Sequence, residues 1–588
     1  MEIPSDDRRI GRNSETVHCE VAPMLETEVL VVGSSLSGMM VTLNLKHRNP
    51  GLDVTVLGPL PTEEKRPLVG ESLVEPGILF FREMGLGPHL DQMQVLKHGL
   101  TFYHKFDLSN PADRAYTVHA PEILYHKARQ MRRQEFDTAC RARAVALGAR
   151  MLHGVADEIE INAGGAKHRV LATINGEKVE IRARWIVDAT GRRRLIGKKV
   201  TKYIRPEKQR CTFWFRLQNF QPFLEHIEVH RRRQWKFDPW LTTHHFLGRG
   251  YWIWLIPLEI GKENLCSMGF TYRPDLFGRR ILSMEDFLAQ VDRDHPALAE
   301  MVRSGEVVDT QMYLDYFYRS ERIYSEDGWF LVGDTARAVD PLYSNGISMT
   351  TVQVGQISEI IERQRAGTLK PGDVAALEAA GLWIMERAQR EVTEQYEIMH
   401  DPFQACMRRY LNVTGWFNAF LPLWWNGFFT TPEGARLLMR LFRDRDEDAE
   451  SLWVLAAEAS AAIGPPYSQE GFDRGPDLDA LINLRFDCAR EDVMKAVTRM
   501  FARRRDMRRS LLAMNGNKNL RREIPRLISE TIRPLLLRLL PRLRPAVFAA
   551  VRPPLPGQYV RWTGPERDVP EPEVPYVGRA VAEVYDRQ

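Results

Sequence analysis

The segment that most constrains the fold of this chain lies at residues 27–59 and reads TEVLVVGSSLSGMMVTLNLKHRNPGLDVTVLGP. Its pattern predicts an apolar strand at 29–32, a turn that contains glycine, a helix at 37–46 and a second apolar strand at 54–57. A strand, a helix and a second strand in this order form a βαβ unit, which opens a nucleotide-binding sheet. The chain therefore has the start of an α/β fold.

The turn has the spacing of the G-x-G-x-x-G nucleotide fingerprint, with two departures from its letters. Gly33 and Gly38 hold the first and third glycine positions, whereas Ser35 holds the middle one. Gly58 stands at the end of the second strand, where the fingerprint carries an acidic residue that binds a ribose. The free amides of the helix N-terminus still suit a pyrophosphate. We predict that Gly33, Ser35 and Gly38 bind a cofactor; a generic βαβ unit is the alternative for this segment alone.

Three later segments add the charged and glycine-containing positions that a nucleotide site needs. RQEFD at 133–137 places a cation on a helix face, DATG at 188–191 ends a strand, and LVGDTARAVDPLYSNG at 331–346 joins a strand to a helix. In the last segment, Asp334 is placed to accept hydrogen bonds from ribityl or ribose hydroxyls. The predicted cofactor-binding residues in these segments are Arg133, Asp188, Gly191, Gly333, Asp334, Pro341 and Gly346.

Taken in order, these segments resemble the FAD-dependent monooxygenase superfamily, whose nucleotide fold is of the glutathione-reductase type, over residues 26–365. Each loop alone is explained equally well by a plain turn at a strand end, but the four together favour an FAD site. The resemblance implies FAD as the cofactor, with the start of the helix near residue 345 facing the N1/O2 edge of its isoalloxazine ring.

An aromatic strand at 251–257, which reads YWIWLIP, narrows the resemblance. Alternation with period two puts Trp252 and Trp254 on one face, and we expect Pro257 to end the strand. Taken alone, two indoles on one face are most simply a pair that faces the core. Within this superfamily, however, W-x-W-x-I-P resembles the signature of the flavin-dependent halogenases.

Two further stretches resemble halogenase segments. VGES at 69–72 looks like the segment that follows the second strand, and VLKHGLTF at 95–102 resembles the segment that carries the catalytic lysine of that family. Lys97 falls at the lysine position. A solvated surface lysine is the alternative, because His98 and Lys105 make this stretch polar.

The resemblance also implies a reaction. Reduced FAD, oxygen and a halide would give hypohalous acid, which a dry, aromatic-lined passage keeps away from water. Lys97 would hold that acid, by a hydrogen bond or as a haloamine, beside the ring to be halogenated. In the family the tryptophan pair, here Trp252 and Trp254, is thought to keep the flavin from oxygenating the substrate directly. The backbone amides of Ser344 and Asn345 are implied as neighbours of the halide.

One position departs from the halogenases that act on free tryptophan. They carry Glu before the serine of the loop that corresponds to DPLYSNG, whereas this chain has Tyr343 before Ser344. This departure resembles the branch that acts on phenols or pyrroles. The predicted acceptor is an electron-rich aromatic small molecule of secondary-metabolite biosynthesis, free or tethered to a carrier protein.

The fold class predicted from these segments is α/β: a Rossmann-like FAD-binding domain with an inserted mixed β-sheet substrate lobe and a helical C-terminal region. The predicted parts are a flexible arm at 1–25, the first part of the FAD-binding domain at 26–200, the substrate lobe at 201–320, the return of the FAD-binding domain at 321–370 and the helical region at 371–588.

Two features of the helical region have open interpretations. Residues 500–552 carry many arginines among leucines. They form either a solvated basic face that covers the core, or a surface that docks an acidic carrier protein or an anionic membrane. The aromatic residues at 416–429 form either packed core or the lid of a substrate channel.

Composition limits the other classes of function. A formal net charge of +4 demands no nucleic-acid partner. The six cysteines lack the spacing of metal ligands, and the adjacent His244 and His245 would point to opposite faces of a strand, so no metal site is predicted. The scattered cysteines and the polar N-terminus favour a cytoplasmic location, with peripheral membrane contact through the basic C-terminal region as the alternative.

We therefore predict FADH2-dependent chlorination or bromination of an aromatic ring, with a halide ion and a separate flavin reductase that delivers FADH2. A first alternative is a flavin-dependent aromatic hydroxylase or monooxygenase, which would use NAD(P)H directly and would not need Lys97. A second is a catalytically impaired paralogue that docks a carrier protein, which the substitutions at Ser35 and Gly58 suggest.

Overall fold

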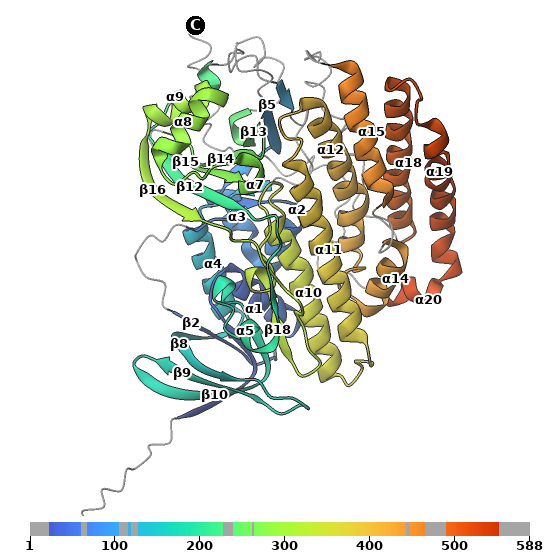
Figure 1. Ribbon diagram of the computed structural model, residues 1–588. Coiled ribbons are helices and arrows are strands. Elements are labelled where there is room, and N and C mark those ends of the chain that lie inside the picture. Colours follow the sequence, from blue (N-terminus) through green and yellow to red (C-terminus); the bar gives the residue numbers. More distant parts are fainter. Residues whose placement is uncertain are drawn as a thin grey trace, which may run out of the picture.

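The structure is a computed structural model that describes residues 23–59, 68–104, 116–118, 128–226, 239–261, 264–442, 447–464 and 490–551. Two β-sheets lie on one side of the molecule, and a row of long C-terminal helices stands beside them (Figure 1). The predicted α/β class, with a mixed second sheet and a helical C-terminal region, is confirmed. Of the predicted flexible arm at 1–25, residues 1–22 lie outside the described residues.

The first sheet contains the predicted βαβ unit. Its strands are β1 (Met24–Val32), β2 (Val54–Gly58), β8 (Arg150–Glu160), β9 (His168–Ile174), β10 (Glu177–Asp188) and β18 (Trp329–Leu331). Five of them run parallel in the order β8, β2, β1, β10, β18. β8 pairs with β2, and β9 joins β8 to β10 in antiparallel pairing. Loops at the carboxyl ends of the parallel strands meet at one edge, where nucleotides bind in such sheets.

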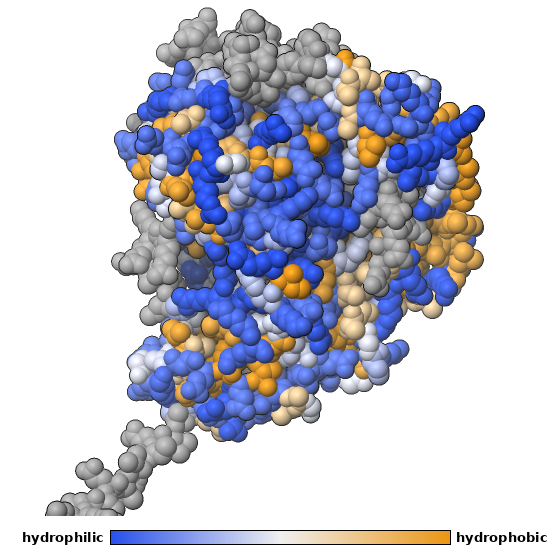
Figure 2. Space-filling view, in the orientation of Figure 1, coloured by the Kyte–Doolittle hydropathy of each residue, from blue (hydrophilic) through white to orange (hydrophobic). Residues whose placement is uncertain are grey.

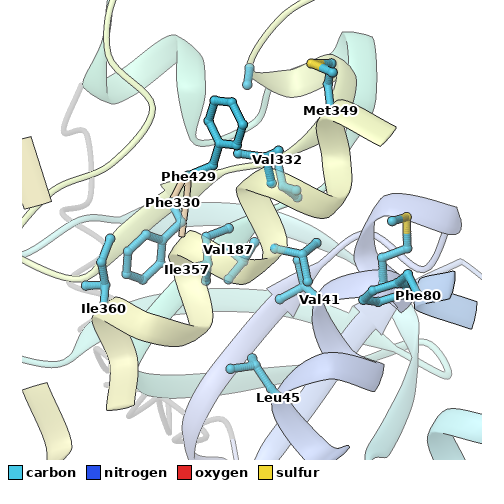
Figure 3. Close-up of a cluster of buried hydrophobic side chains, with 14 of the residues drawn as sticks. Val41, Leu45, Phe80, Val187, Phe330, Val332, Met349, Ile357, Ile360 and Phe429 are labelled. Atoms are coloured by element: carbon cyan, nitrogen blue, oxygen red, sulfur yellow. The ribbon is translucent and has the colours of Figure 1, made fainter. Parts of the chain in front are cut away.

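Helices bury the faces of the parallel strands, as such sheets require. α1 (Leu36–Arg48) contacts α10 (Asn345–Arg365) and α4 (Arg133–Ala146). Figure 3 shows Val41 of α1, Val187 of β10 and Ile357 of α10 in one apolar cluster between sheet and helices. All three side chains are fully buried. This packing fixes the N-termini of α1 and α10 relative to the strand ends.

The second sheet is the mixed sheet expected of the substrate lobe. Its strands, in spatial order, are β16 (Glu306–Tyr313), β12 (Cys211–Gln218), β15 (Leu265–Tyr272), β14 (Tyr251–Glu259), β13 (Thr243–Gly248), β5 (Leu100–His104) and β6 (Tyr116–Val118). β5 and β6 come from an earlier part of the chain than residues 201–320. The sheet therefore connects β5, which follows soon after Lys97, to the strand of the two tryptophans by way of β13.

β14 alternates as its sequence predicts. Trp252, Trp254 and Ile256 belong to one buried cluster, whereas Tyr251, Ile253 and Leu255 belong to another, which α8 (Met284–Asp294) and α9 (Pro296–Ser304) help to form. The expectation that Pro257 ends the strand is wrong, because β14 pairs with β15 as far as Glu259. β13 pairs with β14 only up to Leu255. No acceptor of β13 therefore lies opposite Pro257, and the strand tolerates a residue that has no backbone N–H to donate.

The C-terminal helices stand side by side, and α19 is the outermost of them in Figure 1. Their bounds are α11 (Asp373–Gln395), α12 (Pro402–Gly415), η7 (Trp416–Phe420), α13 (Leu421–Trp425), α14 (Pro432–Phe442), α15 (Glu447–Ile463), α18 (Arg490–Met514), α19 (Leu520–Leu543) and α20 (Pro545–Ala550). In the part of the chain that the structure describes, no helix is long and apolar enough to cross a membrane.

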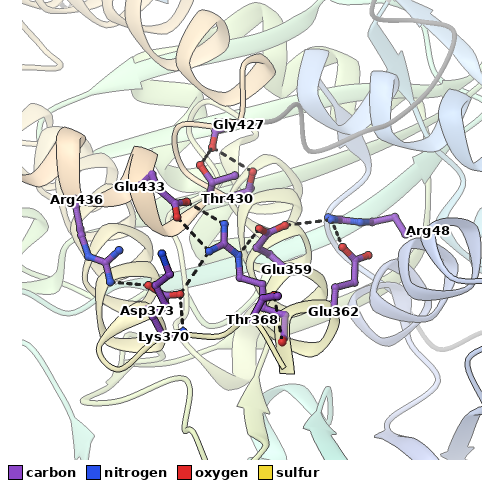
Figure 4. Close-up of polar contacts among 12 residues, drawn as sticks. Arg48, Glu359, Glu362, Thr368, Lys370, Asp373, Gly427, Thr430, Glu433 and Arg436 are labelled. Atoms are coloured by element: carbon purple, nitrogen blue, oxygen red, sulfur yellow. Dashed lines mark hydrogen bonds and ion pairs between the residues drawn. The ribbon is translucent and has the colours of Figure 1, made fainter. Parts of the chain in front are cut away.

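A partly buried ionic network ties α10 to the C-terminal helices (Figure 4). Arg363 of α10 donates to Glu359 at 2.8 Å and to Glu433 of α14 at 2.9 Å. Asp373, at the start of α11, accepts a hydrogen bond from Arg436 of α14 at 2.6 Å. Because each charge has opposite partners, their burial is compensated. The helix whose N-terminus faces the predicted cofactor loops is thereby held against the helical region.

Candidate active site

Lys97 is buried in a small three-stranded sheet that contacts β14. It ends β4 (Val95–Lys97), which pairs with β7 (Ala128–Gln130), and β7 also pairs with β3 (Ser72–Leu73). The shared neighbour brings Lys97 to the VGES segment, where its Nζ donates to Ser72 Oγ at 2.6 Å. Burial lowers the pKa of the Lys97 ammonium to about 7, although the nearby Glu75 carboxylate opposes the shift. Lys97 is 3% exposed, so the surface-lysine alternative is wrong.

Glu75 is a second ionisable group beside Lys97, and the sequence reasoning did not select it. It opens α2 (Glu75–Phe81), is buried, and accepts a hydrogen bond from Trp416 Nε1 at 3.0 Å. Burial raises the pKa of its carboxyl group, against the hydrogen bonds it accepts and the attraction of Lys97. An acidic residue in the first turn of a helix is common, so its sequence position gave no signal of function.

Lys97 and Glu75 line a largely apolar cavity of 280 Å³. Tyr343 and Asn345, at the start of α10, also line it. The rest of the wall is mostly from the C-terminal helices and includes Ile384, Ala388, Leu411, Val413, Trp416, Phe417, Ala419, Phe420, Leu423, Phe429, Met500 and Phe501. The cavity therefore connects the lysine to the N-terminus of α10. An apolar pocket with a few converging polar groups is the usual form of a small-molecule site.

The aromatic residues at 416–429 are shared between packed core and cavity wall, and their predicted role as the lid of a substrate channel stays a prediction. Trp424 and Phe428 are fully buried in the main core. Trp416 and Phe417 are only partly buried and line the cavity. Phe429, at the end of the stretch, is both buried core and part of the cavity wall, so the two placements overlap.

The tryptophan pair lies behind the cavity wall. Phe102, which lines the cavity, stacks on His245 with ring centroids 4.6 Å apart, and His245 lies 5.6 Å from Trp252. Trp252 and Trp254 are 5.6 Å apart, and neither indole is among the residues that line the cavity. His244 faces the other side of the sheet, as the alternation predicts. Burial lowers the pKa of His245 to about 3, so its ring is neutral.

Hydrogen bonds fix both indoles. Trp252 Nε1 donates to the Tyr396 hydroxyl at 2.7 Å, and that hydroxyl donates to Asp340 Oδ2 at 2.8 Å. Trp254 Nε1 donates to Ser267 Oγ at 3.3 Å. A buried indole N–H needs such a partner. The pair is therefore held rigidly, although its predicted role toward the flavin stays a prediction.

The glycine turn after β1 is shaped by contact with the DATG loop. Gly33 has φ = 117°, and a Cβ there would lie 2.4 Å from the carbonyl oxygen of Ala189. A Cβ on Gly38 would lie 2.0 Å from the carbonyl oxygen of Gly33. Ser35 caps α1 in an extended conformation without a side-chain hydrogen bond to the helix. The amides at the start of α1 are thus presented by a close-packed loop, as a pyrophosphate requires.

Gly58 has a structural explanation. A Cβ at this position would lie 2.4 Å from Ser34 Oγ and 2.9 Å from the Ser34 amide nitrogen. The glycine turn therefore rests directly on the end of β2. The acidic side chain of the usual fingerprint would displace Ser34 here, so a ribose must find its partners on other residues.

The loop after β18 presents a carboxylate. Gly333 has φ = 63°, and a Cβ on it would lie 2.3 Å from Ser37 Oγ of α1. The next residue, Asp334, is exposed, while its backbone carbonyl accepts a hydrogen bond from the Tyr318 hydroxyl at 2.6 Å. Gly191 has φ = 58° and open space where its side chain would be. These loops leave room and hydrogen-bond acceptors beside the N-terminus of α1.

The Asp188 carboxylate accepts hydrogen bonds from the loop that follows it. Its Oδ1 accepts from the amide of Thr190 at 3.0 Å, and its Oδ2 accepts from the amides of Ile196 and Gly197 at 2.7 and 2.9 Å. A carboxylate with this many donors is fixed in place. The structure thus shows Asp188 shaping the loop that carries Gly191, and its predicted contact with the cofactor stays a prediction.

Arg133 links α4 to the VGES segment. Its Nε donates to Asp137 at 3.0 Å, and its Nη1 donates to the backbone carbonyls of Val69 and Gly70. The guanidinium therefore holds the loop that leads to Ser72, the partner of Lys97. Its predicted contact with the cofactor is untested.

The loop before α10 ends in an unusual backbone conformation. The Ser344 amide donates to the Pro341 carbonyl at 2.9 Å, and Ser344 itself has φ = 57°, which is rare for a residue other than glycine. Its hydroxyl makes no capping hydrogen bond. Gly346 is exposed, with nothing within 4 Å of a Cβ built on it. The amides that begin α10 are therefore accessible, as the electron-rich edge of a flavin requires.

The predicted cofactor residues fit FAD. Two accessible helix N-termini suit its pyrophosphate and the edge of its ring, and the exposed carboxylate of Asp334 suits a sugar hydroxyl. Close backbone contacts at Gly33 and Gly333 hold these groups in one place.

Comparison with known proteins agrees with this site. A family model described as FAD binding domain matches residues 26–351. The flavin-dependent halogenase chlA of Dictyostelium discoideum is 26% identical over 370 residues, which cover 57% of this chain and 60% of that protein. The 1H-pyrrole-2-carbonyl-[peptidyl-carrier protein] chlorinase of Pseudomonas fluorescens is 26% identical over 48% of this chain and 65% of its own length. The chain thus spans under two thirds of the length of these two relatives.

The fold has solved counterparts. The crystal structure of halogenase PltM superimposes with a TM-score of 0.58 at 16% identity and covers 82% of this chain and 96% of PltM. A PltM structure in complex with phloroglucinol and FAD gives a TM-score of 0.59 at 17% identity, with the same coverage. At such identities the likeness shows the fold alone. Together with the family match it confirms the predictions of a Rossmann-like fold and of FAD as the cofactor. The chain therefore belongs to the FAD binding domain family, and within it the chain is related in sequence to the flavin-dependent halogenases.

Proposed function

We propose that the protein is an oxidoreductase that halogenates an electron-rich aromatic ring, with FADH2 supplied by a separate flavin reductase. One observation carries the proposal: Lys97, a buried lysine with a pKa near 7, shares an apolar cavity with the start of α10. When bound, reduced FAD supplies, with oxygen and chloride or bromide, the oxidation of the halide to hypohalous acid. The residues of the chain must then keep that acid dry and direct it to the ring.

Lys97 is suited to hold the hypohalous acid. With a pKa near 7, a large share of its amine is neutral at neutral pH, and a neutral amine is nucleophilic toward halogen. The hydroxyl of Ser72 accepts from Nζ at 2.6 Å and so orients it. In the overall step a ring C–H bond is replaced by a carbon–halogen bond, the oxidised halogen is reduced as it takes up ring electrons, and the hydroxyl group of the acid leaves as water with the ring proton.

Glu75 is suited to take up the ring proton. Its raised pKa makes it a stronger base than an exposed carboxylate, and Trp416 holds it at the cavity wall. We infer that Glu75 supplies the carboxylate that Tyr343 does not. Trp252 and Trp254 support the wall from behind through His245 and Phe102. Because the Ser344 amide donates to the Pro341 carbonyl, the Asn345 amide at the start of α10 is the halide neighbour in this proposal.

The cavity also limits the acceptor. A volume of 280 Å³ with mostly apolar walls suits an aromatic ring that carries an apolar substituent. Two of the relatives are named for a pyrrole-2-carbonyl group on a peptidyl-carrier protein. A carrier-bound pyrrole therefore belongs beside free phenols in the substrate panel.

The decisive experiment supplies the full chain with FAD, a flavin reductase, NADH, oxygen and bromide, and measures product masses across the panel. Wild type is compared with Lys97→Met, Glu75→Gln and, as a matched control, Lys199→Met at an exposed lysine. We expect bromide-dependent products from wild type and the control. Lys97→Met should lose them, and Glu75→Gln should make them about 100-fold more slowly, which is typical of a lost general base.

The same assay separates the alternatives. An oxygen-containing product that forms with NADPH without the reductase, and persists in Lys97→Met, would show a hydroxylase and contradict the proposal. A purified chain that retains no flavin would indicate the impaired, carrier-docking paralogue.

A further inference from the structure

α19 carries a continuous apolar stripe on its outward face. The stripe recurs every three or four positions along the whole helix, and its exposed members are Leu520, Ile524, Ile528, Ile532, Leu535, Leu536, Leu539 and Leu543. Leu535 is 58% exposed and Leu543 is 68% exposed. Figure 2 shows hydrophobic residues along the edge of the molecule where α19 lies. An apolar patch of this length on a surface usually marks an interaction site.

The acidic side chains of α19 are buried, whereas its exposed charged side chains are basic. Its two acidic residues, Glu523 and Glu530, are buried, and both accept hydrogen bonds from Arg508 of α18. Its exposed charged residues are all cations, namely Arg521, Arg522, Arg538 and Arg542, and Arg544 follows directly. The outward side of α19 is therefore apolar and positively charged, without any negative charge.

The buried ion pairs also fix the rotation of the helix. Arg508 is fully buried, and Leu537 of α19 is buried on the same side as Glu523 and Glu530. Turning the stripe inward would break a buried charge network and leave Arg508 unpaired, which is costly. The stripe is therefore directed outward by the packing of α19 on α18.

We propose that the outward face of α19 binds the surface of an anionic membrane. The helix spans roughly 36 Å at 1.5 Å per residue and would lie flat, with its leucines and isoleucines at the boundary of headgroups and acyl chains. The exposed arginines would meet lipid phosphates. Two copies of the chain that paired through this face would bring like charges together, so a membrane fits the face better than a second copy.

The test is sedimentation of the full-length, FAD-loaded chain with vesicles. Neutral vesicles contain phosphatidylcholine alone, and anionic vesicles also contain phosphatidylglycerol. We expect the wild-type chain to bind anionic vesicles at least tenfold more tightly than neutral ones. A stripe variant, Ile528→Ser/Leu535→Ser/Leu539→Ser, should lose at least tenfold in affinity for anionic vesicles. A charge variant, Arg522→Gln/Arg538→Gln/Arg542→Gln, should lose the preference for them.

The matched control is Val307→Ser/Val308→Ser/Met312→Ser, which removes exposed apolar side chains from β16 instead. It should bind as wild type does. Thermal unfolding and flavin content must match wild type in every variant, which excludes misfolding as the cause of lost binding. This experiment needs no halogenation activity, so its outcome is independent of the proposed reaction.

Three results would overturn the proposal. Wild type could stay unbound, or the stripe variant could bind anionic vesicles as tightly as wild type. The chain could instead form a dimer that the stripe variant converts to a monomer, which would assign the face to a second copy.

Discussion

Lys97 and Glu75 are separated in the sequence by three consecutive helical segments, α2, a π-helix at Arg82–Leu86 and α3 (Gly87–Met93), and they meet at one wall of the cavity. Each is driven by burial toward its neutral form, since the pKa of the lysine falls and that of the carboxyl group rises. Groups whose pKa values are moved toward neutrality are typical of catalytic sites. The ionisation of Lys97 should therefore be visible both in catalysis and in the stability of the fold.

The pH profile of halogenation should report Lys97. If the neutral amine carries the halogen, kcat/KM rises as pH increases through about 7 and then levels off. The measurement is the rate of bromination of one phenol from pH 5.5 to 9, with FADH2 held constant. Lys97→Arg should lack this ionisation, because a guanidinium does not titrate in that range. A rate that instead falls through pH 7 would show that the ammonium is the working form.

Burial of Lys97 should reduce the stability of the fold in a pH-dependent way. Its pKa is lower in the folded chain than the 10.5 of a free lysine, so the cost is fully present below about pH 7. It fades between pH 7 and 10.5, where only the unfolded chain keeps the proton. Lys97→Met should therefore raise the melting temperature more at pH 6 than at pH 9, which calorimetry can measure. An equal change at both pH values would contradict a buried, titrating lysine.

Among the elements, those with a clear period in the sequence were the most predictable. The βαβ unit and the two-sided burial of β14 follow from local apolar spacing. The continuation of β14 past Pro257 does not, because it depends on where the neighbouring β13 stops. Membership of β5 in the second sheet is likewise set by pairing across distant parts of the chain.

The residues of the candidate site also divide into those that a local motif predicts and those that only tertiary contacts explain. Motif resemblance was enough to select Lys97, since its segment is contiguous. Glu75 became visible only through the small sheet that joins β3 and β4 by way of β7. The reason for Gly58 also lies in tertiary contact, because the glycine turn rests on it.

The glycine turn is packed so closely that a single added methyl group at Gly38 should disturb flavin binding. Gly38→Ala would place a methyl group 2.0 Å from the Gly33 carbonyl oxygen, so the turn must open and its amides lose their alignment. We expect flavin content to fall at least tenfold, as measured by absorbance of the purified protein. Gly51→Ala, where nothing lies within 4 Å, is the control and should keep its flavin. Full flavin content in Gly38→Ala would show that this turn does not hold the cofactor.

At the scale of the whole molecule, the helical region completes the cavity. α11, α12, η7 and α18 supply most of its wall, so the FAD-binding part and the substrate lobe alone would leave the lysine open to water. Exclusion of water matters because hypohalous acid reacts with many nucleophiles. The ionic network around Arg363 holds this wall against α10.

The cavity wall should select acceptors by size. Ala388 of α11 lines the cavity, and Ala388→Trp would fill part of its 280 Å³. We expect KM to rise about tenfold for a phenol with a long alkyl chain, because its chain loses space, and to change little for an unsubstituted phenol. Steady-state kinetics on the two acceptors measures the difference. Equal effects on both would place Ala388 beside the reacting ring instead.

α18 has one side on the cavity, through Met500 and Phe501, and packs with another side against α19. An α-helix with its side chains is about 10 Å thick, so two helix layers, α18 and α19, separate the acceptor from whatever the outward face of α19 binds. On a membrane, a water-insoluble acceptor would reach the enzyme by lateral diffusion in the lipid. Turnover would then follow the mole fraction of acceptor in the bilayer, and adding inert lipid at constant acceptor would slow the enzyme by surface dilution.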